Sequence, residues 1–281
     1  MNIMNLFPLY DQIKFSVLMS LYIKETLDNF IASYKSILEN TIQPNQVVIV
    51  FDGPVQKDIE DFLNEEIENG SPVTILKIPN NVGLGNALNF GLRQCQHEWV
   101  FRMDTDDICL PDRFKTQIDY IKSNPNTVVV GGHIAEFDSL MINPIGLRKV
   151  PLLNKDIIKH AKFRSPFNHM TVAFKKSVIL SVGGYQHHHL MEDYNLWLRI
   201  IAKGFEVGNI DEVLVNVRAG REMLQRRRGV SYIKSEWYLM LLKYKLSYQS
   251  LFSAFIVFVL RSFPRLLCGN MQRIIYRWLR K

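Results

Sequence analysis

The chain has 281 residues, and its 47% apolar and 22% charged content is that of a globular protein, which excludes an intrinsically disordered chain. Residues 237–281 contain eight Lys or Arg and no Asp or Glu, so the net charge of +7 leaves −1 for residues 1–236. This distribution excludes a generally basic, nucleic-acid-binding surface and predicts an anionic partner for the C-terminal segment alone.

The first half of the chain alternates between strand and helix patterns. Short apolar runs predict strands at 15–20, 47–51, 73–78, 99–101 and 127–131. Helices are expected between them, at 27–38, 59–67, 83–91 and 111–122. Four such alternations predict a mostly parallel sheet with right-handed crossovers and helices on both faces.

The second half is less regular. We expect a strand at 168–174, a short helix at 175–180 and a longer helix that begins at Glu192. Three consecutive histidines, 187–189, precede that helix. Because consecutive side chains do not point at one centre, we expect an exposed loop there and not a metal site.

Polar side chains follow four of the predicted strands at the point where each strand ends. They are Tyr22, Asp52, Asn81 and an acidic cluster made of Asp104, Asp106 and Asp107. In open parallel sheets, ligands bind outside the carboxyl ends of the strands. The sequence therefore predicts one ligand site at this edge of the sheet.

The acidic cluster places three carboxylates within four residues. Such charges repel one another by about 1 kcal/mol per pair even in bulk water, so a cation is expected among them. Carboxylate oxygens at this spacing suit Mg²⁺ or Mn²⁺, which take one or two protein carboxylates and complete their shell with substrate phosphates. The alternative is an acidic surface turn in which Asp107 caps the helix that starts near Pro111.

A second acidic group, the acidic pair Glu192 and Asp193, lies in the first turn of the helix predicted over 192–199. Negative side chains in this position stabilise a helix by interacting with its macrodipole, which needs no functional explanation. The same carboxylates at the rim of a site would serve as a general base. Both interpretations are open at this point.

The C-terminal segment has an apolar run, 251–260, that is shorter than the ~20 residues needed to span a bilayer. Beyond Pro264, apolar residues alternate with arginines in a basic amphipathic pattern. We expect a peripheral anchor on an anionic membrane surface, and the alternative is a helix packed on the domain with a solvated outer face.

The compartment is expected to be reducing and cytoplasmic. Three widely spaced cysteines, Cys95, Cys109 and Cys268, argue against a disulfide framework and a zinc cluster. The N-terminal segment has no basic region, continuous apolar run or small-residue cleavage site of a secretory signal. With the expected anchor, this predicts a cytoplasmic protein bound peripherally to the inner face of the cytoplasmic membrane.

Seven short motifs carry a family resemblance. They lie at 20–22, 48–52, 80–83, 104–107, 111–113, 183–185 and 192–197. In this order they resemble family 2 glycosyltransferases, over roughly residues 15–220 of the chain. Residues 226–229 with Tyr232 and Glu236 resemble the subgroup that builds bacterial surface polysaccharides of the amylovoran and O-antigen type.

The resemblance implies a GT-A fold in residues 1–230, an α/β, Rossmann-like, mostly parallel sheet flanked by helices. Residues 231–281 would form a basic amphipathic helical extension that associates with a membrane. The implied activity is inverting and metal-dependent, with Mn²⁺ or Mg²⁺. It would move a hexose from a UDP-sugar to a polyprenyl-diphosphate-linked sugar in O-antigen or exopolysaccharide biosynthesis.

The resemblance also assigns donor-binding residues. Tyr22, Glu25 and Asp52 would flank the uracil and ribose of the donor, Asn81 belongs to the same nucleotide-sugar group, and Asp104 would lie towards the ribose. Two departures affect this group. Residues 86–89 lack the arginine of the family's usual small-Arg-Asn stretch, and the first strand ends in Met-Ser-Leu-Tyr where Pro-Thr-Tyr-Asn is usual.

The remaining implied roles concern the metal, the base and the acceptor. Asp106 would bind the metal on the diphosphate, and Asp107 would assist it or cap a helix. Asp193, or its neighbour Glu192, would be the general base. Candidate contacts to the acceptor or its diphosphate are His169, Arg226, Arg227 and Arg228.

Two alternative functions share parts of this pattern. A sugar nucleotidyltransferase would need a glycine-rich, basic loop after the first strand, which residues 19–24 lack. A catalytically inactive, membrane-associated scaffold would have no need of an intact Asp106 and Asp193. Metal-dependent UDP binding distinguishes the scaffold from the enzyme.

Overall fold

The computed structural model describes residues 13–219 and 229–266. In this part of the chain, nine strands form one sheet in the order β3-β2-β1-β4-β8-β6-β9-β5, with β7 paired to β6. The strands are β1 (Phe15–Leu21), β2 (Gln46–Asp52), β3 (Val73–Ile78), β4 (Trp99–Arg102), β5 (Ile108–Cys109), β6 (Thr127–Phe137), β7 (Pro144–Arg148), β8 (Ala173–Lys175) and β9 (Glu206–Arg218). The helices are α1 (Leu27–Leu38), α2 (Lys57–Glu68), α3 (Leu84–Gln94), α4 (Arg113–Ser123), α5 (Asn154–His160), α6 (Lys176–Ser181), α7 (Glu192–Ala202), α9 (Val230–Lys245) and α10 (Leu251–Leu266).

The first four strands confirm the predicted parallel α/β arrangement. β3, β2, β1 and β4 are parallel neighbours, with Leu21 opposite Phe51 and Asp52 opposite Ile78. Parallel neighbours end at the same edge, so the residues that follow β1, β2, β3 and β4 meet there. This edge is where the polar strand ends were expected to converge.

The strands beyond β4 are mixed in direction. β8 is antiparallel to both β4 and β6, and the long β9 is parallel to β6 with register shifts along the pair. The strand predicted over 168–174 is wrong for its first half, where His169–Thr171 form a 3₁₀ turn and β8 begins only at Ala173. The Thr171 hydroxyl donates to the Asn168 carbonyl at 2.8 Å, and such local bonds compete with strand pairing.

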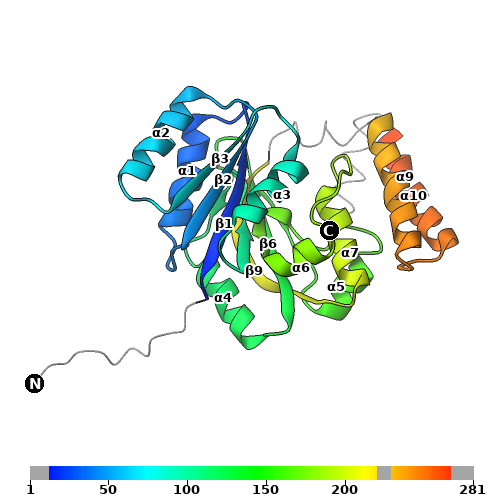
Figure 1. Ribbon diagram of the computed structural model, residues 1–281. Helices are drawn as coiled ribbons and strands as arrows, with labels where there is room; N and C mark the ends of the chain where they lie inside the picture. The colour runs from blue at the N-terminus through cyan, green and yellow to red at the C-terminus, as the bar shows by residue number, and fades with distance from the viewer. Residues whose placement is uncertain (1–12, 220–228, 267–281) are drawn as a thin grey trace, which may run out of the picture.

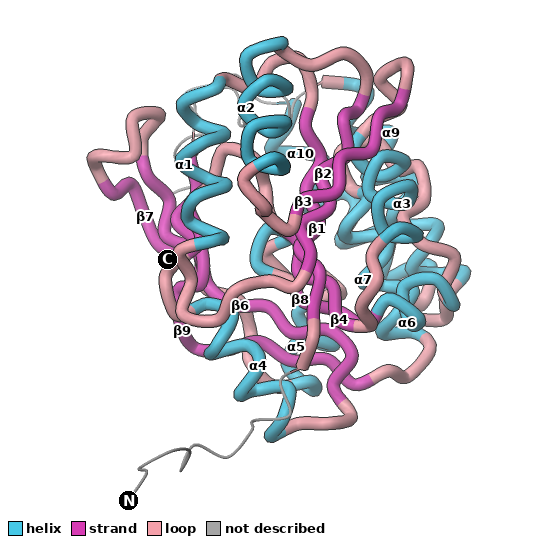
Figure 2. The backbone as a smooth tube through the Cα atoms, turned by 60° about the vertical axis from the view of Figure 1, so that its left-hand side comes forward, coloured by secondary structure: helices cyan, strands magenta, loops and turns pink. Residues whose placement is uncertain are grey.

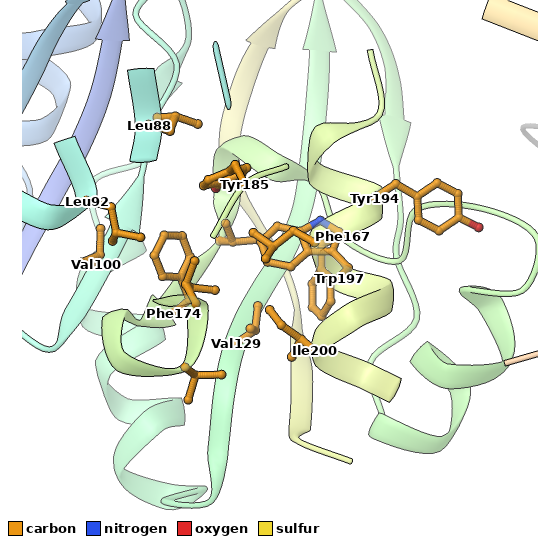
Figure 3. Close-up of a cluster of buried hydrophobic side chains, with 14 of the residues drawn as sticks. Leu88, Leu92, Val100, Val129, Phe167, Phe174, Tyr185, Tyr194, Trp197 and Ile200 are labelled. Atoms are coloured by element: carbon orange, nitrogen blue, oxygen red, sulfur yellow. The ribbon is translucent and has the colours of Figure 1, made fainter. Parts of the chain in front are cut away.

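Alternate residues of the central strands supply two hydrophobic cores, one on each face of the sheet. In β1, Val17 and Met19 pack on the side of α1, α2 and α4, whereas Leu18 packs on the side of α3 and α7. Figure 2 shows the strands between α1 and α2 on one side and α3, α6 and α7 on the other. On the second side, Trp197 of α7 packs against Phe167 beneath Tyr185 (Figure 3).

The C-terminal helix pair, α9 and α10, lies at the outside of the molecule beside α7 (Figure 1). One side of each helix is buried, and the other exposes large apolar side chains such as Phe252, Val259 and Phe263. Among the helices of residues 13–219 and 229–266, none combines the length and the hydropathy needed to cross a membrane.

Candidate active site

Asp52 organises the loop between β3 and α3. Its Oδ1 accepts the Val82 N–H at 2.6 Å and its Oδ2 accepts the Gly83 N–H at 3.1 Å, while the Asn81 amide donates to the Asp52 carbonyl. Gly53 has φ +86°, and a Cβ there would lie 2.8 Å from the Asn81 nitrogen. Asp52 is 4% exposed, so it stabilises the loop from the interior and offers little surface to a ligand.

The turn after β1 brings Tyr22 and Glu25 to the same edge. The Glu25 N–H donates to the Tyr22 carbonyl at 3.1 Å, and the Tyr22 side chain is 37% exposed. The Glu25 carboxylate is buried and accepts the Thr26 N–H at 3.0 Å and the Thr105 hydroxyl at 2.5 Å. Glu25 therefore joins the β1 turn to the acidic cluster, and Tyr22 offers the more accessible surface.

The acidic cluster follows β4 in a confined space. Burial raises the pKa of Asp106 to about 7, with further increases from Asp104 and Glu25. Burial and the same kind of repulsion, from Asp104 and Asp106, raise the pKa of Asp107 well above its ordinary value. The mutual repulsion expected from the sequence is therefore present, and the negative charge here is incompletely compensated.

Asp107 does not cap α4. Its Oδ1 accepts the Arg218 N–H at 2.9 Å, and its side chain is 2% exposed. The residue preceding α4 is Asp112, whose side chain makes no capping hydrogen bond. The capping interpretation is wrong because β9 ends beside the cluster, and the backbone N–H of its last residue, Arg218, donates to the Asp107 carboxylate.

Two arginines of this region were not predicted as site residues. Arg218 ends β9, and its Nε donates to the Asp106 carbonyl at 3.2 Å. Arg102 ends β4, is 2% exposed and pairs with the Asp104 carboxylate. Burial alone would lower the pKa of Arg102, but the charges of Asp104 and Asp107 outweigh it and raise the pKa. The position of Arg102 at a predicted strand end could have identified it as a site residue. The local sequence around Arg218 gives no such indication.

The chemistry of the cluster fits a divalent cation shared with a phosphate. Within the described residues, no three His, Cys, Asp or Glu side chains are grouped closely enough to hold a metal by themselves. Mg²⁺ and Mn²⁺ need only one or two protein carboxylates when phosphate oxygens complete the shell. Asp104 is about one-third exposed and Asp106 is half-buried, so these two carboxylates are the most accessible donors.

The acidic pair lies at the N-terminus of α7, against the N-terminus of α3. A Cβ on Gly85 would lie 3.3 Å from the Glu192 Cγ, so glycine permits this close packing. Burial, followed by the Asp193 charge, raises the pKa of Glu192. The Asp193 Oδ2 accepts the Ser165 hydroxyl at 3.4 Å. Because Asp52 holds the loop that leads into α3, the acidic pair is placed next to the strand edge.

Tyr185 is buried beside α3, in the loop before α7. Burial raises the pKa of its hydroxyl, and Arg102, Asp193 and Asp104 all act on it electrostatically. The Asn89 amide holds the Tyr185 backbone in place, accepting its N–H at 2.8 Å and donating to its carbonyl at 2.7 Å. The sequence motif at 183–185 included this residue, but its central position follows only from the packing of α3 against the loop before α7.

The proposed acceptor residues divide into two groups. The His169 Nε2 is 2.8 Å from the Tyr185 hydroxyl, and burial, together with Arg102, lowers the pKa of His169 well below its usual range. It is therefore a neutral partner of Tyr185 near pH 7. Arg226, Arg227 and Arg228 lie outside the described residues.

The histidine loop before α7 differs from the prediction. His188 is 5% exposed, and its Nε2 lies 2.9 Å from the Ser235 carbonyl of α9. The prediction of an exposed loop is confirmed for His187 and His189 and is wrong for His188, which α9 covers from far along the chain.

Comparisons with known proteins show the family to which the chain is similar. The family model of Glycosyl transferase family 2 matches residues 16–180. The chain is 43% identical to the amylovoran biosynthesis glycosyltransferase AmsE of Erwinia amylovora, over 95% of this chain and 99% of the relative. It is 39% identical to the UDP-Gal:alpha-D-GlcNAc-diphosphoundecaprenol beta-1,3-galactosyltransferase of Escherichia coli, over 95% and 96% of the two chains.

A solved structure shares the fold. S. aureus TarS in complex with UDP-GlcNAc superposes with a TM-score of 0.67, covering 92% of this chain and 77% of that chain. The two sequences are 16% identical over this match, so the likeness concerns the fold alone.

Proposed function

The chain belongs to glycosyl transferase family 2, and from that premise we propose that it moves a hexose from a UDP-sugar to a polyprenyl-diphosphate-linked sugar, with inversion. The observation that supports this most directly is geometric: the acidic cluster follows β4 at the carboxyl edge of the parallel strands, and the acidic pair packs against the start of α3, the helix that follows β3. An in-line displacement needs stabilisation of the leaving diphosphate on one side of the anomeric carbon and a proton acceptor on the other. Two separate acidic groups can provide these two functions. The printed names of the relatives point to bacterial surface polysaccharide assembly, in which we place this enzyme.

The acidic cluster is the proposed donor side. Asp106 would bind Mn²⁺ or Mg²⁺, with Asp104 next to it towards the ribose. The ion would stabilise the charge that develops on the departing diphosphate. The buried Asp107, engaged with the Arg218 N–H, would support Asp106 from behind. Tyr22 would pack against the uracil, while Asp52 and Glu25 hold the surrounding loops.

The acidic pair is the proposed acceptor side. The acceptor hydroxyl oxygen bonds to the anomeric carbon, the bond from that carbon to the diphosphate oxygen breaks, and the hydroxyl proton passes to the Asp193 carboxylate. A well-placed general base contributes about 10²–10⁴-fold to such a step. We take Asp193 as the base and keep Glu192 as the alternative, because the Ser165 hydroxyl donates to the Asp193 carboxylate and would help to hold it in place.

The C-terminal helix pair is the proposed membrane contact. Residues 231–281 would form this region, and residues 1–230 the catalytic domain. The exposed apolar side chains of the pair follow one face of each helix: Trp237, Tyr238, Leu241, Tyr244, Phe252, Phe255, Ile256, Val259, Leu260 and Phe263. With the basic residues of the C-terminal segment, each attracted to anionic lipid by about 1 kcal/mol, this face suits the inner surface of the cytoplasmic membrane.

Calorimetric titration with UDP, with and without Mn²⁺, tests the donor side in the wild type and in Asp106→Ala. We expect micromolar binding that needs both the ion and Asp106. A panel of UDP-sugars with a GlcNAc-diphosphate-lipid acceptor then tests transfer. Unchanged UDP affinity in Asp106→Ala would remove the metal assignment, and binding without transfer to any acceptor would favour the inactive scaffold.

Vesicle flotation tests the membrane contact. The variant Phe252→Ser/Phe255→Ser/Phe263→Ser removes three exposed aromatic side chains from α10 and leaves its buried side unchanged. We expect the wild type to float with vesicles that contain phosphatidylglycerol and the variant to remain in the soluble fraction. Equal flotation of the two proteins would show that lipid contacts another surface.

A further inference from the structure

α9 and α10 are joined by a buried ion pair. The Arg261 Nε donates to Glu236 Oε2 and its Nη2 donates to Glu236 Oε1, both at 2.7 Å. The Glu236 side chain is 1% exposed. Burial alone would lower the pKa of Arg261, but the Glu236 charge outweighs it and raises the pKa. A bidentate pair of this kind fixes orientation as well as distance, so the two helices act as one unit.

This unit contacts the residue directly after Asp193. The ring of Tyr194 lies 5.0 Å from the Lys243 Nζ of α9 and 5.6 Å from the Arg261 guanidinium of α10. The Arg261 guanidinium stays charged, and a cation within about 6 Å of an aromatic centroid is attracted to the ring, while Lys243 packs near the same ring. The first turn of α7 is therefore held by a side chain from each helix of the pair.

The side chains of Tyr194, Lys243 and Arg261 also bind the turn that follows α5. Three successive carbonyls of this turn accept hydrogen bonds: Ala161 from the Tyr194 hydroxyl at 2.7 Å, Lys162 from Lys243 Nζ at 2.6 Å, and Phe163 from Arg261 Nη1. Ser165 lies two residues beyond this turn and donates to the Asp193 carboxylate. The turn thus ties the helix pair to the other partner of Asp193.

The helix pair also holds the chain just before the acidic pair. The His188 Nε2 must carry a proton, since its partner at 2.9 Å is the Ser235 carbonyl of α9, and its Nδ1 accepts from the Asn195 amide at 3.1 Å. Burial lowers the pKa of His188, in keeping with a neutral ring. Contacts from α9 therefore lie on both sides of Glu192 and Asp193 along the chain.

We propose that Glu236 and Arg261 are positioning residues for the Asp193 carboxylate, an inference that rests on the proposed role of Asp193 as the base. A general base must lie within about 2.6–3.2 Å of the proton that it takes. Displacement by about 1 Å through a remote change is enough to reduce a rate about 10²-fold. Glu236 is buried and bound to Arg261, so its proposed action passes through Arg261, Tyr194 and the turn after α5.

The test compares Arg261→Met and Arg261→Lys in the full chain. The donor probe is UDP-galactose, and the acceptor is GlcNAc-diphosphate on a short, water-soluble alkyl chain, which removes membrane binding from the measurement. We expect Arg261→Met to lower kcat at least tenfold, with donor KM and UDP affinity changed less than twofold. Arg261→Lys keeps the charge and should restore part of kcat.

A matched control and a double variant separate positioning from general destabilisation. Lys203→Met removes the same charge at the other end of α7, where its side chain is exposed, and should leave kcat unchanged. Arg261→Met/Asp193→Asn should be no slower than Asp193→Asn alone, because Arg261 acts only through Asp193. Glu236→Gln, which keeps the shape of Glu236, provides a second variant if Arg261→Met does not fold.

Two outcomes would overturn the proposal. One is an unchanged kcat in the folded Arg261 and Glu236 variants. The other is a multiplicative loss in the double variant, which would show that Arg261 acts independently of Asp193. Failure of the proposed role of Asp193 is distinguishable from both outcomes. It would appear as persisting transfer in the Asp193→Asn single variant, in which the ion pair is unchanged.

Discussion

The acidic cluster and the acidic pair reach the same edge of the sheet by different routes. The cluster follows β4 directly, and its place is set by the parallel pairing of β4 with β1. The acidic pair stands at the start of α7, which is held by α9, α10 and the turn after α5. The first placement belongs to the sheet itself, whereas the second depends on contacts between segments far apart in the chain.

This difference separates the two halves of the proposed reaction. The family model covers residues 16–180, which include the acidic cluster and end before the acidic pair. The relatives at 43% and 39% identity align over 95% of this chain, including the region that holds α7. The contrast teaches that the donor side and the base can be disturbed independently, by changes in different parts of the molecule.

The largest expected effect isolates the base. Asp193→Asn keeps the size of the side chain but removes the proton acceptor, so kcat should fall by about 10²–10⁴-fold. UDP affinity, measured by calorimetry with Mn²⁺, should stay within twofold because the acidic cluster is untouched. Glu192→Gln serves as the neighbouring control and should cost less; the reverse order would move the base to Glu192.

A pH experiment tests the support of α7 without using activity. Burial, with a further contribution from Arg261, lowers the pKa of Lys243 to about 7 in the folded protein, although Glu236 opposes the shift. Between about pH 7 and the ordinary lysine pKa the unfolded chain binds the extra proton, so stability rises with pH there, by up to about 1.4 kcal/mol per unit.

Denaturant unfolding at pH 7 and at pH 9 measures this slope. Lys243→Met removes the titrating group and should show a flatter dependence of the free energy of unfolding on pH over the same window. Lys203→Met, which removes the exposed lysine that follows α7, should keep the wild-type slope. Parallel curves for the wild type and Lys243→Met would show that this lysine titrates normally.

The smallest expected effect is an increase in stability, and it concerns the acidic cluster and not the acidic pair. Asp106→Asn removes one of several mutually repelling carboxylates, so without divalent metal it should stabilise the fold by about 1 kcal/mol. Mn²⁺ with UDP should raise the Tm of the wild type and leave that of the variant unchanged. A less stable variant in metal-free buffer would mean that the Asp106 charge is already compensated in the folded protein.

The positions of the residues assigned to the proposed donor side were largely predictable from the sequence, whereas their roles stay predictions. Strands such as β2 are buried on both faces, so their continuous apolar runs are distinctive, and parallel pairing brings their ends together. Asp52 and Asp104 could therefore be assigned to one edge before any contact was known. The bonds from Val82 and Gly83 to Asp52 could not be predicted from local patterns, because they depend on where the loop after β3 returns.

The remaining site residues depend on pairings that local patterns do not determine. Arg218 reaches the acidic cluster from the end of β9, more than a hundred residues away in sequence. His188 is buried because α9 covers it, although its own segment is polar and lacks periodicity. Arg261 belongs to a helix whose composition suggested only a surface for lipid, and its inward-facing bond to Glu236 is a tertiary feature.

The two sides of α10 have a practical consequence for protein engineering. Its outer side exposes Phe252, Phe255 and Phe263, which would limit solubility in aqueous buffer, while its inner side carries Arg261. Shortening the chain to obtain a soluble enzyme would remove both sides at once. Replacing the three outer phenylalanines with polar residues would raise solubility and leave the inner side unchanged. Solubility and kcat could then be changed independently through the two sides of one helix.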